Sequence, residues 1–204
     1  MLCGNLVAQD YVRPNDGELW FSAQLNKEIT DKVSVSLKEA IRFDGDVSAL
    51  KVVFTQASAK YRIIKPWSVS VGYRFSTTEN YEQRHRLILS SQVKQKIKRF
   101  SLSWRLRYEK ESETRKPIEN RLRNRFKLAY NPKNSDFGYY ASFETFYSYD
   151  YRYADISRFR YTLGLEYEIN KKTDVNLSGI FQHDTNIARP KEDTILRLGL
   201  SYDL

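Results

Sequence analysis

The chain has 204 residues, a net charge of +9 and a single cysteine, Cys3, and it is rich in aromatic residues, with 15 Tyr and 11 Phe. The length suits one domain, the lone cysteine excludes an internal disulfide, and no run of about 18 apolar residues is present to form a transmembrane helix. The mean hydropathy of −0.64 does not exclude a membrane protein, because transmembrane strands alternate lipid-facing and lumen-facing residues.

Residues 1–9 are predicted to be the remnant of a secretory signal. The segment Leu6–Gln9 resembles the end of such a signal, with cleavage before Asp10, although the charged start and most of the apolar core are absent. An ordinary N-terminal arm is the alternative. Because Cys3 follows Leu2 rather than a small residue, no lipid anchor is predicted, and residues 10–204 are assigned to one barrel domain.

The rest of the chain alternates between apolar and polar residues with a period of two, which is the pattern of β-strands. In residues 100–108, which read FSLSWRLRY, apolar residues occupy the even positions and serines and arginines the odd ones. Most predicted strands have ten to thirteen residues, and at a rise of about 3.3 Å and a tilt of about 45° they span a bilayer core of roughly 30 Å. Eleven strands are predicted, over residues 18–29, 32–43, 50–63, 67–76, 84–94, 98–110, 119–130, 137–148, 157–168, 173–183 and 193–204.

The predicted connections alternate between short and long. The short ones lie at 30–31, 64–66, 95–97, 131–136 and 170–172, and the long ones at 44–49, 76–83, 111–118, 149–156 and 184–192. Bacterial outer-membrane barrels have short periplasmic turns and longer outer loops. The alternation therefore favours such a barrel over a soluble sandwich.

The predicted count of eleven strands is odd. Single-chain bacterial barrels, however, usually have an even number of strands and both termini in the periplasm. A further strand at residues 4–13, with a turn at Pro14–Gly17, would bring the eleven to twelve, which is the preferred expectation, and ten is the alternative. The predicted fold is an all-β, antiparallel up-and-down transmembrane β-barrel of 10–12 strands.

The apolar face of these strands is predicted to contact lipid. Eleven strands with five or six bulky apolar residues each would overpack the inside of a small barrel. Large rings also cluster near the strand ends, with smaller residues such as Val71 and Leu89 between them, as expected for aromatic girdles at two membrane interfaces. The preference of aromatic residues for strands is the alternative explanation. The girdle residues are Tyr61, Trp67, Phe100, Tyr130, Tyr139, Tyr167 and Tyr202 near the short connections, and Phe43, Phe75, Tyr108, Tyr147, Phe159 and Phe181 near the long ones.

The last strand resembles the signal that bacterial barrels present to their assembly machinery. Leu196, Leu198, Leu200 and Tyr202 share one face with Leu204, although that signal usually ends in an aromatic residue. We expect an integral protein of the bacterial outer membrane with a periplasmic C-terminus. Its expected partners are outer-membrane lipid and lipopolysaccharide, the assembly machinery and other envelope proteins.

The polar face is predicted to line the lumen. The planar guanidinium of arginine makes several bonds to carboxylates and carbonyls at once. A packed ionic network is favoured over an open, anion-preferring pore, because small barrels fill their interior with side chains. The predicted basic network comprises Arg74, Arg84, Arg86, Arg105, Arg107, Arg121, Arg123, Arg125, Arg158 and Arg160, with Glu109, Glu119, Glu144 and Glu166 as acidic partners and Arg42, Arg62 and Arg197 on the same face.

No motif for catalysis, metal binding or cofactor binding is found in the sequence. The two histidines, His85 and His183, fall on the lipid-side face near the outer strand ends. They match neither the outer-membrane phospholipase nor the omptin protease pattern. Nucleic acid is not an expected partner, because the arginines are spread over most strands and no helix is present to enter a groove.

Six segments carry strand patterns that together point to one family: LKEAIRF (37–43), VGYRF (71–75), EQRHR (82–86), WRLRY (104–108), NRLRNRF (120–126) and FRYTLGLEY (159–167). They resemble an outer-membrane barrel family of Bacteroidota known as a domain of unknown function. The resemblance extends from about Glu18 to Leu204. It implies the fold and the location, and it supplies no active site.

The sequence therefore predicts a non-enzymatic, porin-like outer-membrane protein of a Gram-negative bacterium. It would act as a structural or accessory subunit of an envelope complex or as a narrow, anion-preferring channel. A small outer-membrane hydrolase and a soluble, lipocalin-like ligand-binding barrel are the alternatives.

Overall fold

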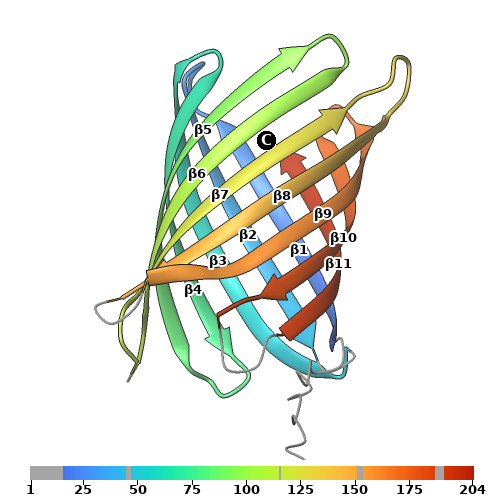
Figure 1. The fold of residues 1–204 in the computed structure, drawn as a ribbon. Coiled ribbons are helices and arrows are strands. Elements are labelled where there is room, and N and C mark those ends of the chain that lie inside the picture. Colours follow the sequence, from blue (N-terminus) through green and yellow to red (C-terminus); the bar gives the residue numbers. More distant parts are fainter. Residues whose placement is uncertain (1–15, 45–46, 115, 151–153, 187–190) are drawn as a thin grey trace, which may run out of the picture.

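The computed structural model describes residues 16–44, 47–114, 116–150, 154–186 and 191–204, so the predicted signal remnant at 1–9 and the further strand at 4–13 lie outside it. The described residues form eleven strands in one closed barrel (Figure 1). The strands are β1 (Asp16–Glu28), β2 (Val33–Asp44), β3 (Ala49–Ile64), β4 (Trp67–Thr78), β5 (Gln83–Ile97), β6 (Phe100–Glu113), β7 (Glu119–Tyr130), β8 (Phe137–Tyr149), β9 (Ala154–Asn170), β10 (Thr173–Asp184) and β11 (Lys191–Asp203).

Each strand pairs antiparallel with the next one along the chain, and the barrel closes where β1 pairs with β11. This closing pair is parallel, with Asp16 opposite Asp193 and Asn26 opposite Asp203. The predicted class of barrel is confirmed, and eleven strands lie within the predicted range. The twelfth strand has no place in the described wall, because both edges of β1 are already paired. The even-number rule assumes antiparallel closure, which this barrel does not use.

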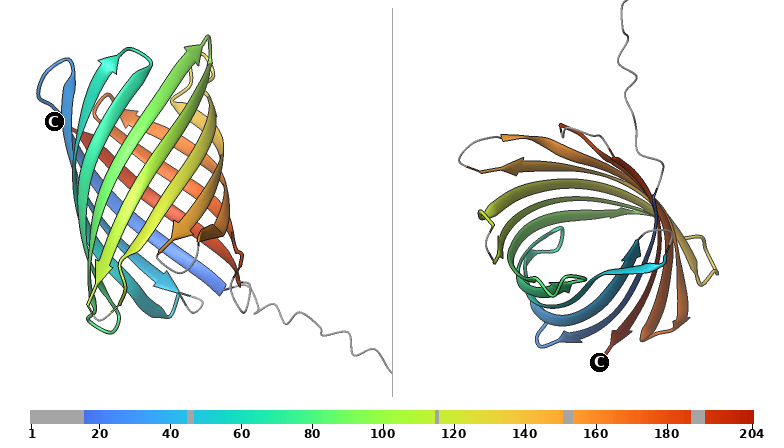
Figure 2. Two further views of the ribbon diagram at one scale, coloured as in Figure 1. Left: turned by 60° about the vertical axis from the view of Figure 1, so that its left-hand side comes forward. Right: turned by 90° about the horizontal axis from the view of Figure 1, so that it is seen from below.

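Figure 2 shows the two rims of the barrel. Their connections have two to six residues at one rim and four to six at the other, so the predicted alternation of short and long connections is only partly present. Lys65–Pro66, Lys98–Arg99 and Lys171–Lys172 are two-residue turns at what we call the short-turn rim. Lys98 has a positive φ of 54°, as in the turn types that two-residue hairpins favour. The opposite, long-loop rim carries the connections from β2 to β3, β4 to β5, β6 to β7, β8 to β9 and β10 to β11.

The outer face of the barrel is apolar. Leu163 is 71% exposed and Leu196 is 50% exposed, whereas Ile195, which points inward beside Leu196, is fully buried. Most of the predicted girdle residues, such as Trp67 and Tyr139, are likewise exposed on the outside. Soluble proteins rarely expose so continuous an apolar surface, so this surface requires an apolar surrounding.

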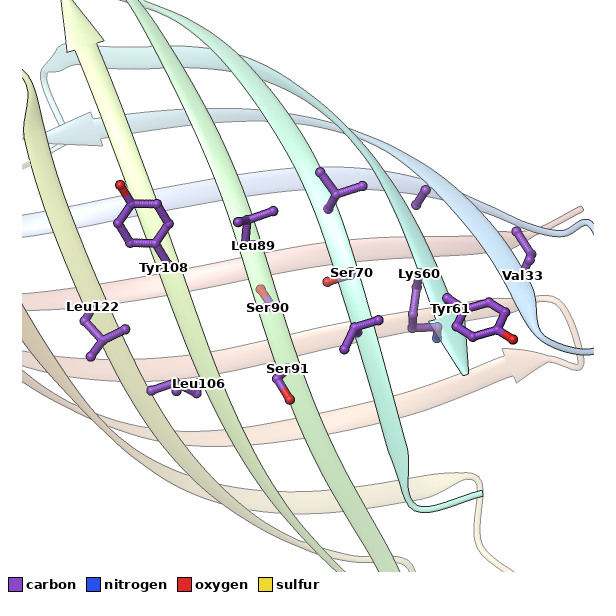
Figure 3. Close-up of a pocket in the computed structure, with 13 residues that line it drawn as sticks. Val33, Lys60, Tyr61, Ser70, Leu89, Ser90, Ser91, Leu106, Tyr108 and Leu122 are labelled. Atoms are coloured by element: carbon purple, nitrogen blue, oxygen red, sulfur yellow. The ribbon is translucent and has the colours of Figure 1, made fainter. Parts of the chain in front are cut away.

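Shallow grooves run between the outward side chains. Figure 3 shows one groove of about 560 Å³ that crosses β2 to β7, with Val33, Leu89 and Leu122 among its lining residues. A groove open to the outside and lined by aliphatic carbon suits a lipid acyl chain. Glu39 is an acidic exception on the outer face, where its carboxylate accepts a hydrogen bond from Thr55 (2.8 Å). No helix in the described part of the chain is long and apolar enough to cross a bilayer.

Candidate functional site in the barrel lumen

The strand register places the charged residues of the inner face in rows that cross neighbouring strands. In one row, Arg105, Arg125, Glu144 and Arg160 are successive cross-strand partners on β6, β7, β8 and β9. Because side chains alternate across a strand, residues two positions apart also share this face. The arginines that recur at every second position of a strand therefore lie next to the arginines of neighbouring strands on the inner face of the barrel.

All ten arginines of the predicted network line one cavity of about 730 Å³ inside the barrel. Of the four predicted acidic partners, Glu119 lines the same cavity, and Glu166 lines a second cavity of about 570 Å³. Glu109 and Glu144 are buried among the arginines. Arg62, which shares the phase of the lumen residues, is exposed and lines neither cavity.

Glu109 is the centre of the first ionic cluster. Its side chain is fully buried, and its oxygens lie 2.7 Å from Arg123, 3.3 Å from Arg86 and 3.5 Å from Arg121. Arg107 is a fourth neighbour at 3.7 Å. A buried charge is costly unless it is paired and hydrogen-bonded, so Glu109 and its arginines depend on one another.

Glu144 is the centre of the second cluster. Arg123 donates to it at 2.9 Å and Arg105 at 3.2 Å, and Arg160 lies 3.8 Å away. Arg123 thus bridges Glu144 and Glu109. We call the part of the lumen formed by β5–β9 the acid-rich wall, because six of its arginines contact these two carboxylates.

Further pairs surround the rim of this wall. Arg84 lies 2.8 Å from Glu113, which also contacts Lys116 at 2.5 Å. The hydrogen bond to Glu113, with a second to Glu82, raises the pKa of the exposed Lys116 ammonium above its ordinary value. Arg158 pairs with Asp184 at 2.5 Å. Ion pairs therefore extend from the centre of the acid-rich wall to its rim, although Arg125 on β7 has no carboxylate at ion-pair distance among the described residues.

The opposite half of the lumen, β1–β4, is different, and we call it the acid-poor wall. Its inward carboxylates, Glu18 and Asp44, both pair with Lys51, at 2.5 and 3.3 Å. Lys38 and Arg42 form no ion pair or hydrogen bond with any residue that the structure describes. Lys38 and Arg42 therefore face the cavity without a carboxylate at ion-pair distance.

Aromatic rings contact arginines on both walls of the lumen. The guanidinium of Arg42 lies 3.9 Å from the ring centre of Trp20, and that of Arg74 lies 3.9 Å from the ring centre of Phe54. Phe146 is approached in the same way by Arg123, at 4.4 Å. These contacts are cation–π interactions, which orient the planar guanidinium.

The two cavities meet beside Tyr140. Both are lined by Lys38, Arg125 and Arg197. Arg197 donates to the hydroxyl of Tyr140 at 2.9 Å, and the Tyr140 ring lies against Gly164, where an added Cβ would come within 2.3 Å of the ring. Because Gly164 has no side chain, the Tyr140 ring can pack directly against its backbone.

Sequence reasoning missed several lumen residues, including Trp20, Lys38, Phe54, Glu111 and Tyr140. The signal was present, because each lies an even number of positions from an arginine or polar residue of the inner face. The inward aromatic residues were not predicted, because aromatic residues were expected to lie in the outer girdles. Which arginine pairs with which carboxylate depends on the register between strands, and no single-strand pattern contains it.

The histidines lie away from the lumen. His85 Nδ1 is 2.5 Å from the hydroxyl of Tyr73, with both side chains exposed on the outer face, and His183 lies 3.3 Å from Glu192. Among the residues of the described ranges, no group of three or more His, Cys, Asp or Glu side chains is placed to hold a metal ion. The alternative prediction of a small outer-membrane hydrolase would use His85 or His183.

Residues 17–193 match the family described as "Protein of unknown function (DUF2490)". The chain belongs to this family. No curated protein sequence matches it.

The DUF2490 barrel is similar in structure to the NanC porin, with a TM-score of 0.60 and 15% sequence identity over 93% of this chain and 99% of the porin. It is also similar to a bacterial polysaccharide outer membrane secretin, with a TM-score of 0.54 and 12% identity over 84% of this chain and 63% of the secretin. These likenesses show that the fold is that of outer-membrane barrels.

Proposed function

We propose that this DUF2490 barrel is a non-enzymatic protein of the outer membrane that forms a narrow passage with a preference for anions. One observation carries the proposal. In the described part of the chain, Lys38, Arg42, Arg74, Arg125 and Arg197 line the cavities without a carboxylate at ion-pair distance. Unneutralised cations inside a low-dielectric wall raise the local concentration of anions.

The alternative role, a structural or accessory subunit of an envelope complex, is supported by the acid-rich wall. The clusters around Glu109 and Glu144 fill part of the lumen with paired side chains. Both roles fit a Gram-negative outer membrane, with Bacteroidota as the proposed host. The apolar outer face suits lipid and lipopolysaccharide, and the last strand, β11, suits the assembly machinery with its end in the periplasm.

Ion selectivity in planar bilayers tests the passage. We expect small conductance steps whose reversal potential in a potassium chloride gradient shows a preference for chloride. Lys38→Glu combined with Arg125→Glu should reduce or reverse this preference. Arg62→Glu with Lys60→Glu is the matched control, because both residues are exposed on β3 and the same change of charge there should leave selectivity unaltered. A cation preference in the wild type, or no current at all, would contradict the passage and favour the structural role.

Insertion into lipid is tested separately. Val71 is 47% exposed on the outer face of β4, and an arginine near the midplane of a bilayer destabilises a barrel by about 2–4 kcal/mol. We expect Val71→Arg to lower the free energy of unfolding, measured by urea titration in lipid vesicles, by this amount and to reduce the heat-modifiable band on gels, while Val71→Leu behaves as the wild type. Normal folding of Val71→Arg would contradict the assignment of the lipid face.

A further inference from the structure

The acid-poor wall contains two neighbouring arginines whose arrangement suggests more than a general attraction for anions. We infer that Arg42 and Arg74 form a binding site for an oxyanion group, such as phosphate or carboxylate, on a solute within the lumen. The inference rests on the proposed passage, because a solute must enter the lumen to reach these side chains.

The first support is that both guanidiniums lack a charged partner. Glu18, the carboxylate of β1, already accepts hydrogen bonds from Lys51 at 2.5 Å and from the Trp20 indole at 2.7 Å. Arg42 has no hydrogen-bond partner among the described residues. Its N–H donors are therefore left for groups in the cavity that it lines.

The second support is that the two guanidiniums are held in place by their faces. Phe54 is buried, and its ring centre lies 3.9 Å from the Arg74 guanidinium and 5.2 Å from that of Arg42. Trp20 adds a second ring, 3.9 Å from Arg42. Stacking covers the face of a guanidinium and leaves its edge, which carries the N–H groups, free to bind a ligand.

Gln56 completes the positioning of Arg74. Its side-chain oxygen accepts hydrogen bonds from Arg74 Nε at 3.1 Å and from Nη2 at 2.7 Å. A guanidinium has five N–H donors, so Arg74 keeps three of them after binding Gln56. The partner is neutral, so the full positive charge of Arg74 also remains.

These features select the chemistry of the ligand. A halide ion binds without direction, whereas phosphate and carboxylate groups present oxygens spaced to accept two parallel N–H bonds from one guanidinium. Arg42 and Arg74 also approach the same ring and line the same cavity, so two positive charges are available to a doubly charged oxyanion. The site should therefore bind phosphate more tightly than chloride. A passage that selects on charge alone would discriminate less between these two anions.

Titration calorimetry of the detergent-solubilised barrel with inorganic phosphate tests the site directly. Arg42→Lys with Arg74→Lys keeps both charges but removes the fork geometry, and we expect it to weaken phosphate binding about tenfold or more. Arg62→Lys is the control, since this exposed arginine of β3 lines neither cavity. Titration with succinate distinguishes a carboxylate site from one confined to phosphate, and heat-modifiable migration confirms that each variant is folded.

The outcomes separate the site from the passage. Wild-type protein that binds phosphate no better than the double lysine variant overturns the site, even if the barrel carries an anion-selective current. Phosphate binding that is lost in the double lysine variant supports the site, and bilayer recordings then decide the passage independently. If both proposals hold, we expect the double lysine variant to retain chloride selectivity in bilayers and to lose phosphate binding in calorimetry.

Discussion

The two halves of the lumen use the same residue type in opposite ways. On the acid-rich wall, arginines such as Arg123 pair with buried carboxylates, and these ion pairs form a network across β5–β9. On the acid-poor wall, Arg42 and Arg74 rest on aromatic rings and keep their charge exposed to the cavity. An arginine-rich strand pattern is therefore not in itself a pore or a plug. Its role is decided by whether a carboxylate reaches it from a neighbouring strand.

The largest effect should come from the centre of the acid-rich wall. Glu109→Gln keeps the shape of the side chain but removes the charge shared by Arg86, Arg121 and Arg123. Breaking a buried ion cluster by removing one partner costs about 3–5 kcal/mol. We expect the free energy of unfolding in urea, measured in detergent micelles, to fall by about this amount.

Glu119→Gln is the matched control on the same wall. Glu119 also pairs with an arginine, Arg121, at 2.5 Å, but it lies near the rim with 35% of its side chain exposed. Exposed pairs contribute about 1 kcal/mol or less. If the two variants lose the same stability, the acid-rich wall is not held together by its buried carboxylates.

A smaller effect is expected at the place where the two cavities meet. Gly164→Ala would put a Cβ within 2.3 Å of the Tyr140 ring, and overpacking of this kind costs about 1–3 kcal/mol. Gly179→Ala on the adjacent strand is the control, because nothing lies within 4 Å of its added Cβ. Combining Gly164→Ala with Tyr140→Ala should cost less than the sum of the two single changes. Additive losses in urea unfolding would show that the ring is not seated on Gly164.

Gln56→Glu should have the smallest effect on stability. It adds to the acid-poor wall a carboxylate of the kind that pairs with arginines on the acid-rich wall. The new carboxylate would accept the hydrogen bonds that Gln56 now receives from Arg74, adding about 1 kcal/mol to stability and lowering the anion preference. Gln92→Glu, opposite Arg105 on the acid-rich wall, should change selectivity less because Arg105 already pairs with Glu144. Equal loss of selectivity in both variants would remove the distinction between the walls.

Much of the barrel could be predicted from the alternation of the sequence. All eleven predicted strands are present, with boundaries shifted by a few residues, because a period of two recurs in strands about twice as long as usual. The face that contains Leu163 and Leu196 could be assigned outward, since so many bulky residues exceed the volume of a small barrel. Local pattern and volume are properties of single strands, and a sequence displays them directly.

The parts that could not be predicted depend on relations between strands. The arrangement of arginines around Glu109 requires the register of three strands, β5, β6 and β7, at once. The inward position of Trp20 and Phe54 opposes the general preference of aromatic residues for membrane interfaces. Parallel closure is likewise invisible in the strand pattern, because antiparallel hairpins account for every other pair in the described barrel.

The parallel seam has a consequence for the order of folding. Every other pair in the described wall joins strands that are consecutive in sequence, whereas the seam joins Asp16 to Asp193. Pairing between distant segments forms late, because the closure entropy of a long loop must be overcome first. Trp20 and Arg197 are partners across this seam, so we expect the edge of the acid-poor wall to meet β11 only at the final step of folding. The hairpins of β1–β4 can form before that step, because they join strands that are consecutive in sequence.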